Sequence, residues 1–191
     1  MDLNDFHPEP KNDHLFRVLF VGSLSLRKGI PYLLDALCGL ILPDFELCLV
    51  GGASKEIEPV LRRYAGKFCL LGFQPRRELS KIYSQASVLV LPSLEEGLAL
   101  VQAQAMACKI PVISTYNSGA EDLFCDGNEG FIIPARDIQA IRDKVLFLFE
   151  NSQERERMAE AAYNRVQEIG GWNRYGEHML MEYKTLLSRK N

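Results

Sequence analysis

The sequence of 191 residues has no long hydrophobic run and only three histidines, and these shortages exclude several classes of protein. No apolar stretch approaches the roughly 20 residues of a membrane-spanning helix. The histidines form neither a His-Glu-x-x-His motif nor a Ser-His-Asp order, and no Walker segment is present. Gly-x-Gly-x-x-Gly does not follow the first apolar run, which argues against NAD. We therefore expect no cofactor and no metal site.

Cysteine is present without a pattern. The five cysteines are odd in number, include no Cys-x-x-Cys pair and lie mostly inside apolar segments. This distribution predicts neither a disulfide framework nor a zinc site, and we expect reduced thiols in a cytoplasmic protein. The first ten residues are polar and lack the apolar core of a signal peptide. The formal net charge of −3 gives no reason to expect nucleic acid as a partner.

Short apolar runs alternate with helical patterns along most of the chain, after a polar segment over residues 1–14 that we interpret as a tail or linker. The runs predict strands at 15–21, 45–50, 68–71, 87–91, 111–114 and 130–133. Helices are expected at 29–40, 54–64, 76–85, 98–109, 121–124, 137–149, 153–166 and 173–187. This alternation predicts an α/β fold for residues 15–191, a Rossmann-like parallel six-stranded sheet with helices on both faces.

Glycine gathers where the predicted strands end. Five of the six ends carry it, in Gly22-Ser23, Gly51-Gly52, Gly72-Phe73, Ser93–Gly97 and Ser118-Gly119. In parallel sheets ligands bind outside the carboxyl ends of the strands. Tight turns alone explain some of these glycines, but their concentration at one edge favours a crevice where the backbone approaches a ligand.

Residues 91–104 are the most informative stretch. A strand ends at Pro92-Ser93, an acidic turn follows at Glu95-Glu96-Gly97, and an alanine-rich helix begins. Free N–H groups at residues 97–100 would stabilise an anion at the helix start. Two carboxylates beside them would repel a phosphate, so we expect a neutral polyhydroxylated group near Glu96 and a phosphate at the amides. A nucleotide-sugar has both parts.

Three neighbouring segments carry a resemblance to a known family. They are Ser93-Leu94-Glu95-Glu96-Gly97, Gln104-Ala105-Met106-Ala107-Cys108 and Pro111-Val112-Ile113-Ser114-Thr115. Together they resemble the signature of the GT-B retaining glycosyltransferases of family 4, in which two acidic residues lie eight positions apart. Glu96 matches the first acid, whereas the second falls on the amide of Gln104. Leu98, Ala99 and Lys109 replace the family's Phe, Gly and Gly.

The resemblance implies that the chain is the C-terminal half of such an enzyme, a nucleotide-sugar-binding domain. The whole enzyme would transfer a hexosyl group from a nucleoside diphosphate sugar to an acceptor, with retention and without a metal. Residues 3–8 resemble the end of the segment that joins the two domains of these enzymes. We therefore expect the N-terminal acceptor-binding domain to be missing, so that this fragment binds the donor without transferring the sugar.

Roles for single residues follow from the same resemblance. Glu96 would hold hydroxyls of the transferred sugar, and Gln104 would bind ribose, accepting through its amide oxygen. Lys28 matches a phosphate-binding lysine; the family's arginine falls on Ser23, and Arg27 would compensate from nearby. The alternative for Arg27 and Lys28 is a solvated basic turn. The other donor-binding positions are Gly22, Ser23 and Gly52 at the crevice edge, Phe73 near the base unless it belongs to the core, and Gly97, Leu98, Ala99 and Leu100 through their amides.

Two other functions stay open. One is a non-catalytic nucleotide-binding or interaction module derived from this fold, in which Gln104 marks lost activity. A weaker one is a phospho-receiver, which needs an acidic pair after the first strand where this chain has Gly22-Ser23.

The last predicted helix has an apolar stripe of Trp172, Tyr175, Met179, Tyr183 and Leu186. The stripe either packs on this domain or is exposed and drives self-association into a homo-oligomer.

Overall fold

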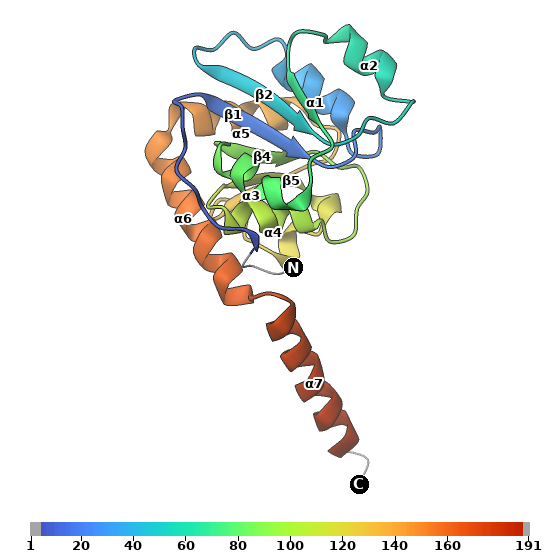
Figure 1. The fold of residues 1–191 in the computed structure, drawn as a ribbon, viewed down its shortest axis with the longest axis vertical. Coiled ribbons are helices and arrows are strands. Elements are labelled where there is room, and N and C mark those ends of the chain that lie inside the picture. The colour runs from blue at the N-terminus through green and yellow to red at the C-terminus, as the bar shows by residue number, and fades with distance from the viewer. Residues whose placement is uncertain (1–4, 189–191) are drawn as a thin grey trace.

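The computed structural model describes residues 5–188, and its centre is a six-stranded sheet in the order β3-β2-β1-β4-β5-β6 (Figure 1). All pairings between neighbouring strands are parallel. The strands are β1 Phe16–Val21, β2 Phe45–Val50, β3 Cys69–Gly72, β4 Val88–Leu91, β5 Val112–Thr115 and β6 Gly130–Ile133. The predicted Rossmann-like sheet is confirmed, with each strand within one residue of its predicted bounds.

Helices cover both faces of the sheet, as predicted. The helices of the described residues are α1 Ile30–Leu37, α2 Glu58–Arg63, α3 Arg76–Ser84, α4 Leu100–Ala107, α5 Ile138–Glu150, α6 Ser152–Ile169 and α7 Trp172–Ser188, of which α7 does not lie on the sheet. Short 3-10 turns occupy Tyr116–Ser118 and Ala120–Asp122, in place of a helix predicted at 121–124. The side chain of Asp137 caps α5 by accepting a hydrogen bond from the Ala140 N–H at 2.9 Å.

The alternation of side chains along β1 divides the core between the two faces. Val18 and Phe20 pack with the cluster beneath α1 and α5, whereas Leu19 and Val21 pack with the cluster beneath α3, α4 and α6. Both sets are buried because β1 lies at the centre of the sheet, paired with β2 on one side and β4 on the other. This double burial explains why β1 is a continuous apolar run rather than an alternating pattern.

Two helices are shorter than predicted at their amino ends. The helix after β4 starts at Leu100 rather than Leu98, because hydrogen bonds from a distant loop hold the preceding turn. The helix predicted from Ser54 starts at Glu58, and the buried Ser54 hydroxyl does not cap it and has no hydrogen-bond partner among residues 5–188. Beyond α4, Lys109 has a φ of 62°, a left-handed conformation that glycine adopts more easily.

The described part of the N-terminal segment, residues 5–14, is not a free tail. Phe6 is buried, and its ring meets Tyr83 edge-on with centroids 6.1 Å apart. The His7 N–H donates to the Ser80 hydroxyl at 3.2 Å, and the Asn12 N–H donates to the Gln85 side chain at 2.8 Å. These contacts fix the segment along α3. Its assignment as an interdomain linker stays a prediction, and residues 3 and 4 lie outside the described part.

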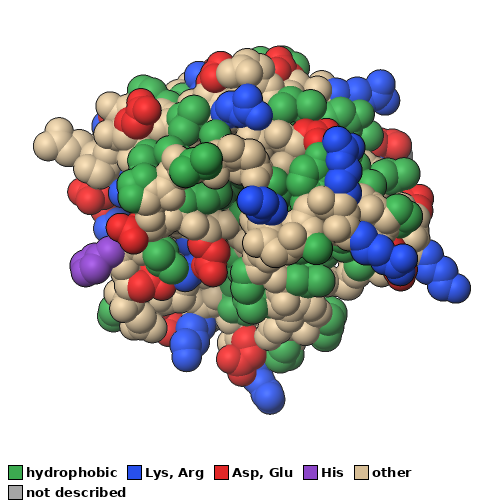
Figure 2. All heavy atoms as spheres, turned by 90° about the horizontal axis from the view of Figure 1, so that it is seen from above, with side chains coloured by type: hydrophobic (Ala, Val, Ile, Leu, Met, Phe, Trp, Pro, Cys, Tyr) green, Lys and Arg blue, Asp and Glu red, His purple; other side chains and the backbone are tan. Residues whose placement is uncertain are grey.

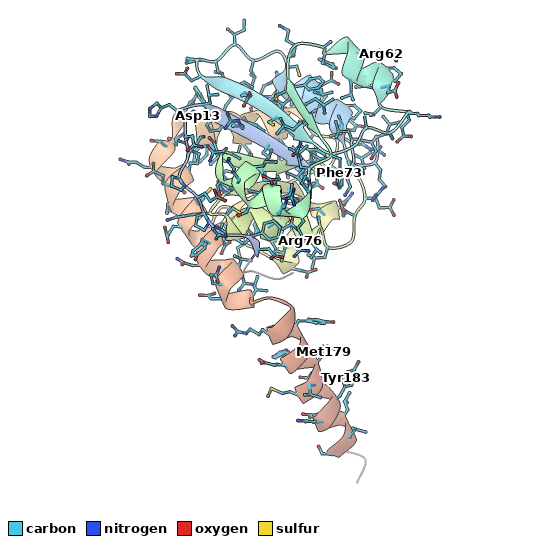
Figure 3. All side chains as sticks on the ribbon, viewed as in Figure 1. Asp13, Arg62, Phe73, Arg76, Met179 and Tyr183 are labelled. Carbon is cyan, nitrogen blue, oxygen red and sulfur yellow. The ribbon has the colours of Figure 1, made fainter. Side chains whose placement is uncertain are left out.

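The last helix projects from the domain (Figure 1). Its apolar side chains are largely exposed, with Met181 at 65% and Leu187 at 68%. Of the predicted stripe, Tyr183, labelled in Figure 3 beside Met179, is 57% exposed, and Leu186 is 56% exposed. The interpretation that the whole stripe packs on this domain is therefore wrong. The side chain of Trp172 lies outside what the structure describes.

Within residues 5–188, no helix combines the length and the apolar character that crossing a membrane requires.

The core between α1 and the sheet is expected to contribute strongly to the stability of the domain. Leu33 is fully buried in it, whereas Ile41, just beyond the same helix, is 98% exposed. Leu33→Ala should lower the free energy of unfolding by about 2–5 kcal/mol through lost burial and the cavity left behind. Ile41→Ala, the matched control, should change it by less than about 0.5 kcal/mol. Urea denaturation followed by circular dichroism measures both, and equal effects would contradict the packing described.

Candidate functional site

The loops after β1 and β4 contact each other directly, although they are far apart in sequence. The Leu94 N–H donates to the Arg27 carbonyl at 2.9 Å. Gly29 has a φ of 71°, and a Cβ on it would lie 1.9 Å from the carbonyl oxygen of Pro92. Only glycine therefore fits where the two loops touch. This contact brings the predicted phosphate residue and the predicted sugar residue to one place.

Lys28 and Glu96 form an ion pair at this meeting point. The Lys28 Nζ donates to both carboxylate oxygens of Glu96. The two side chains are only 11% and 17% exposed. The Ser93 hydroxyl also donates to Glu96, at 3.1 Å, and Thr115 donates to the Ser93 carbonyl at 2.6 Å. The interpretation of Lys28 as part of a solvated basic turn is wrong, because the residue is buried and paired.

The loop that follows β5 holds the acidic turn in place. The N–H of Glu96 donates to the Asn117 carbonyl at 2.9 Å, and the Asn117 side chain donates to the Leu94 carbonyl at 2.7 Å. Gln102, fully buried on α4, donates to the Ser118 carbonyl at 2.8 Å. From the sequence, this loop was predicted only as a turn with glycine, at Ser118-Gly119. The signal that could have revealed its role was its place after the strand next to β4.

The same loop changes one predicted contact. The Ala99 N–H donates to the Ser118 carbonyl at 3.2 Å, so it is not a free donor for a phosphate. Binding a phosphate through the Ala99 amide would require this contact to break, and the role of Ala99 stays a prediction. Gly97, Leu98 and Leu100 are exposed at the start of α4, where donors and the helix dipole favour an anion.

Gln104 lies on α4 with its amide oxygen already engaged. The Tyr83 hydroxyl, on α3, donates to the Gln104 Oε1 at 2.9 Å. Tyr83 is fully buried, and burial raises the pKa of its hydroxyl well above the usual value, so the group stays protonated. An amide oxygen has two lone pairs and can accept a second hydrogen bond, so the role of Gln104 toward a ligand stays a prediction.

The remaining predicted residues surround the crevice edge. Arg27 is exposed and donates to the Glu95 carbonyl at 2.9 Å, which places its guanidinium beside the acidic turn. Ser23 and Gly52 are exposed, and Gly22 is partly exposed. Phe73, at the end of β3, is 83% exposed (Figure 3), so its interpretation as a core residue is wrong.

An apolar groove of about 320 Å³ adjoins the acidic turn. Leu98 and Leu100, which are 50% and 42% exposed, form part of its lining, and the rest comes from Ala103, Leu123, Val166, Ile169, Gly170, Gly171 and Tyr175.

On the face drawn in Figure 2, acidic and basic side chains are interspersed rather than gathered into a basic surface. Among the described residues, no group of three or more His, Cys, Asp or Glu side chains is arranged to hold a metal ion.

Comparison with known proteins agrees with the fold and with the sequence signature. The family model for glycosyl transferases group 1 matches residues 2–165, and the chain belongs to this family. A probable sucrose-phosphate synthase of Thermosipho melanesiensis is 26% identical over 100% of this chain and 46% of its own length. The chain thus spans about half the length of the curated relatives it matches.

Solved structures give the same assignment of the fold. The C-terminal domain of a group 1 glycosyl transferase from Francisella tularensis superposes with a TM-score of 0.79 and 22% identity, over 88% of this chain and 97% of that domain. Anabaena HepE, solved in complex with UDP-glucose, superposes with a TM-score of 0.84 and 20% identity, over 97% of this chain and 56% of its own. The chain therefore has the fold of the C-terminal half of a GT-B glycosyltransferase.

The Lys28–Glu96 pair should couple the two loops energetically. Removing either partner leaves a largely buried charge without its counterion, so Lys28→Ala and Glu96→Ala should each lower the free energy of unfolding by about 1–3 kcal/mol. The double variant should lose clearly less than the sum, because neither charge is then stranded. Urea denaturation of all four proteins measures this cycle. Strictly additive losses would mean that the pair does not join the loops.

Proposed function

We propose that the chain is the donor-binding half of a retaining glycosyltransferase, which transfers a hexosyl group from a nucleoside diphosphate sugar to an acceptor. The observation that carries this proposal is the meeting of Lys28 and Glu96, one from each loop at the carboxyl ends of two adjacent parallel strands. That place is where ligands bind in sheets of this kind. The chemistry of the two side chains suits the two halves of such a donor.

Glu96 suits the sugar because a carboxylate only accepts hydrogen bonds and sugar hydroxyls donate them. Lys28 suits the diphosphate as a point charge. The Arg27 guanidinium lies beside the acidic turn and could add a second cation, because its contact with the neutral Glu95 carbonyl does not compensate its charge. On binding, the donor would replace the direct Lys28–Glu96 contact with one contact to each half of the ligand. Charge on the leaving diphosphate would be stabilised by these cations and by the start of α4.

Transfer itself requires an acceptor, and we propose that an N-terminal acceptor-binding domain supplies it. The chain spans 46% of the sucrose-phosphate synthase relative and 56% of the Anabaena protein. The 191-residue chain is thus expected to bind the donor without transferring the sugar. Catalysis in the whole enzyme needs no metal under this proposal.

One observation favours a second function, a non-catalytic nucleotide-binding module. Gln104 stands where the family signature has an acid, so the site lacks one negative charge. A module of this kind would bind a nucleotide and make little distinction between the nucleotide and its sugar conjugate, because turnover of the sugar would no longer matter. Affinity for the sugar part therefore separates the two functions.

Calorimetric titration with UDP, GDP and ADP tests donor binding. One nucleotide should bind saturably, and Lys28→Ala should weaken it by about 10- to 100-fold, the usual effect of losing a charge-assisted hydrogen bond. The matching nucleotide-sugar should bind more tightly than the nucleotide, and Glu96→Ala should remove that gain.

Lys67→Ala is the matched control. This exposed lysine precedes β3 and so lies near the amino ends of the parallel strands, whereas the site lies at their carboxyl ends. Its affinities should equal those of the unaltered chain. Absence of binding by a folded protein would contradict the donor-binding proposal. Binding of a nucleotide with no gain from the sugar would favour the non-catalytic module.

We also propose that the exposed stripe of α7 drives self-association of the chain. Tyr183→Lys combined with Leu186→Lys should shift the protein toward monomer in sedimentation velocity at high concentration, because burying apolar area favours association. The control combines His178→Lys with Thr185→Lys, which adds the same charge at exposed polar positions of the same helix. A chain that is already monomeric at high concentration would contradict this proposal.

A further inference from the structure

Cys48 on β2 and Cys69 on β3 lie directly opposite each other, although α2 separates them in the sequence. They are register partners in the parallel pairing of the two strands. Neighbouring strands lie about 4.7–4.9 Å apart, and a disulfide joins residues whose Cα atoms are about 4.4–6.8 Å apart. Both side chains pack with the cluster beneath α3, α4 and α6, so they project from the same face of the sheet. The fold thus places two thiols side by side where the sequence has no cysteine motif.

A groove of about 380 Å³ opens beside this pair of cysteines. Cys48 and Cys69 both line it, together with Lys81, Ile82 and Gln85 from the end of α3. Cys69 is partly exposed, whereas Cys48 is only 3% exposed. A small reagent in the groove can therefore reach Cys69 first, with Cys48 next to it.

The strand that carries Cys69 can move toward its neighbour at little cost. β3 has four residues and lies at the edge of the sheet, beside β2. Leu70 and Leu71 are 48% and 40% exposed, so β3 is held by less packing than the central strands. The Cβ atoms of a disulfide lie about 3.5–4.5 Å apart, slightly closer than the strand spacing. An edge strand can make this small approach without disturbing the core.

We propose that Cys48 and Cys69 form a redox-active dithiol, a modification site at which a small disulfide such as glutathione disulfide converts the two thiols into an intramolecular disulfide. The Cys69 thiolate attacks one sulfur of the reagent, forms a mixed disulfide and releases the first glutathione thiolate. Cys48 then loses its proton to water, attacks the Cys69 sulfur and releases the second. Two electrons pass from the protein to the reagent, which leaves as two molecules of glutathione.

Burial determines the order of the two attacks. Burial, and after it the neighbouring Cys69, raise the pKa of the Cys48 thiol, so Cys48 stays protonated at neutral pH. Because the thiolate is the nucleophile in these reactions, Cys48 is unsuited to the first attack, which needs an encounter with the reagent. The second attack is intramolecular, and proximity compensates for the small fraction of thiolate.

Peptide mapping of the unaltered chain tests the proposal. The folded, reduced protein is incubated with glutathione disulfide, free thiols are blocked with N-ethylmaleimide, and peptides from trypsin and endoproteinase Asp-N are identified by mass spectrometry. Asp44 lies between Cys38 and Cys48, so these two cysteines fall on separate peptides. The Cys48–Cys69 link should exceed the mixed disulfide at Cys69 by at least about tenfold, because the second attack is intramolecular.

Other cysteines of the same chain are the controls. Cys125 is exposed and precedes β6, at the opposite edge of the sheet from β3, so it should stop at the mixed disulfide. Cys108 is 2% exposed and should stay unmodified while the domain is folded. Cys48→Ala should leave Cys69 as a lasting mixed disulfide, and thermal melting confirms that this variant is folded.

Phenylarsine oxide, which binds two neighbouring thiols at once, gives a second readout that needs no variant. In the reduced protein it should protect Cys48 and Cys69 together from N-ethylmaleimide and leave Cys125 reactive. Failure to protect the pair would contradict the proposal.

A lasting mixed disulfide at Cys69 of the unaltered chain, or no reaction at Cys69 while Cys125 reacts, would overturn the proposal. Modification of Cys108 as fast as Cys69 would also overturn it, since the link would then require unfolding. These measurements involve no nucleotide, so their outcome is independent of the proposed function.

Discussion

The site depends on the reversal of strand order between β1 and β4. From β1 the chain builds the sheet outward through β2 and β3, then returns to add β4 on the other side of β1. No crossover helix covers the carboxyl ends of the two strands at this point, so their loops can meet. Lys28 and Glu96 are 68 positions apart and form an ion pair because of this topology. Without the parallel pairing of β1 and β4, the two charges would have no reason to meet.

The ion pair explains how two largely buried charges are stable in one site. Each charge is largely removed from water, and each would be costly alone. Ser93 and the backbone of residues 96–99, held by the loop after β5, keep the carboxylate in one orientation. A ligand that carries both an anion and hydroxyl groups can satisfy both charges at once, whereas a simple anion or a neutral sugar satisfies only one. The pair therefore favours a ligand with both parts.

The elements and the location of the site could be predicted from sequence because both depend on local patterns. The run Phe16–Val21 is apolar throughout since it is buried on both faces, and turns after such strands gather at one edge. Contacts between distant positions could not be predicted in this way. The Ala99 amide is engaged by Ser118, and the Gln104 oxygen by Tyr83, and no pattern near either residue indicates its partner. The exposure of Phe73 was likewise undecided, since an aromatic residue after a strand is typical of both a core and a surface.

The Tyr83 contact also bears on what the amide at position 104 means. A carboxylate and an amide both offer an oxygen to the buried hydroxyl, so the protein side of the contact is equally satisfied by either. Either residue type at position 104 can therefore accept the hydrogen bond that joins α3 to α4. A substitution that merely removed function could equally be an alanine, which would leave the Tyr83 hydrogen without its acceptor. An amide keeps this internal hydrogen bond, so the link between α3 and α4 does not depend on a charge at position 104.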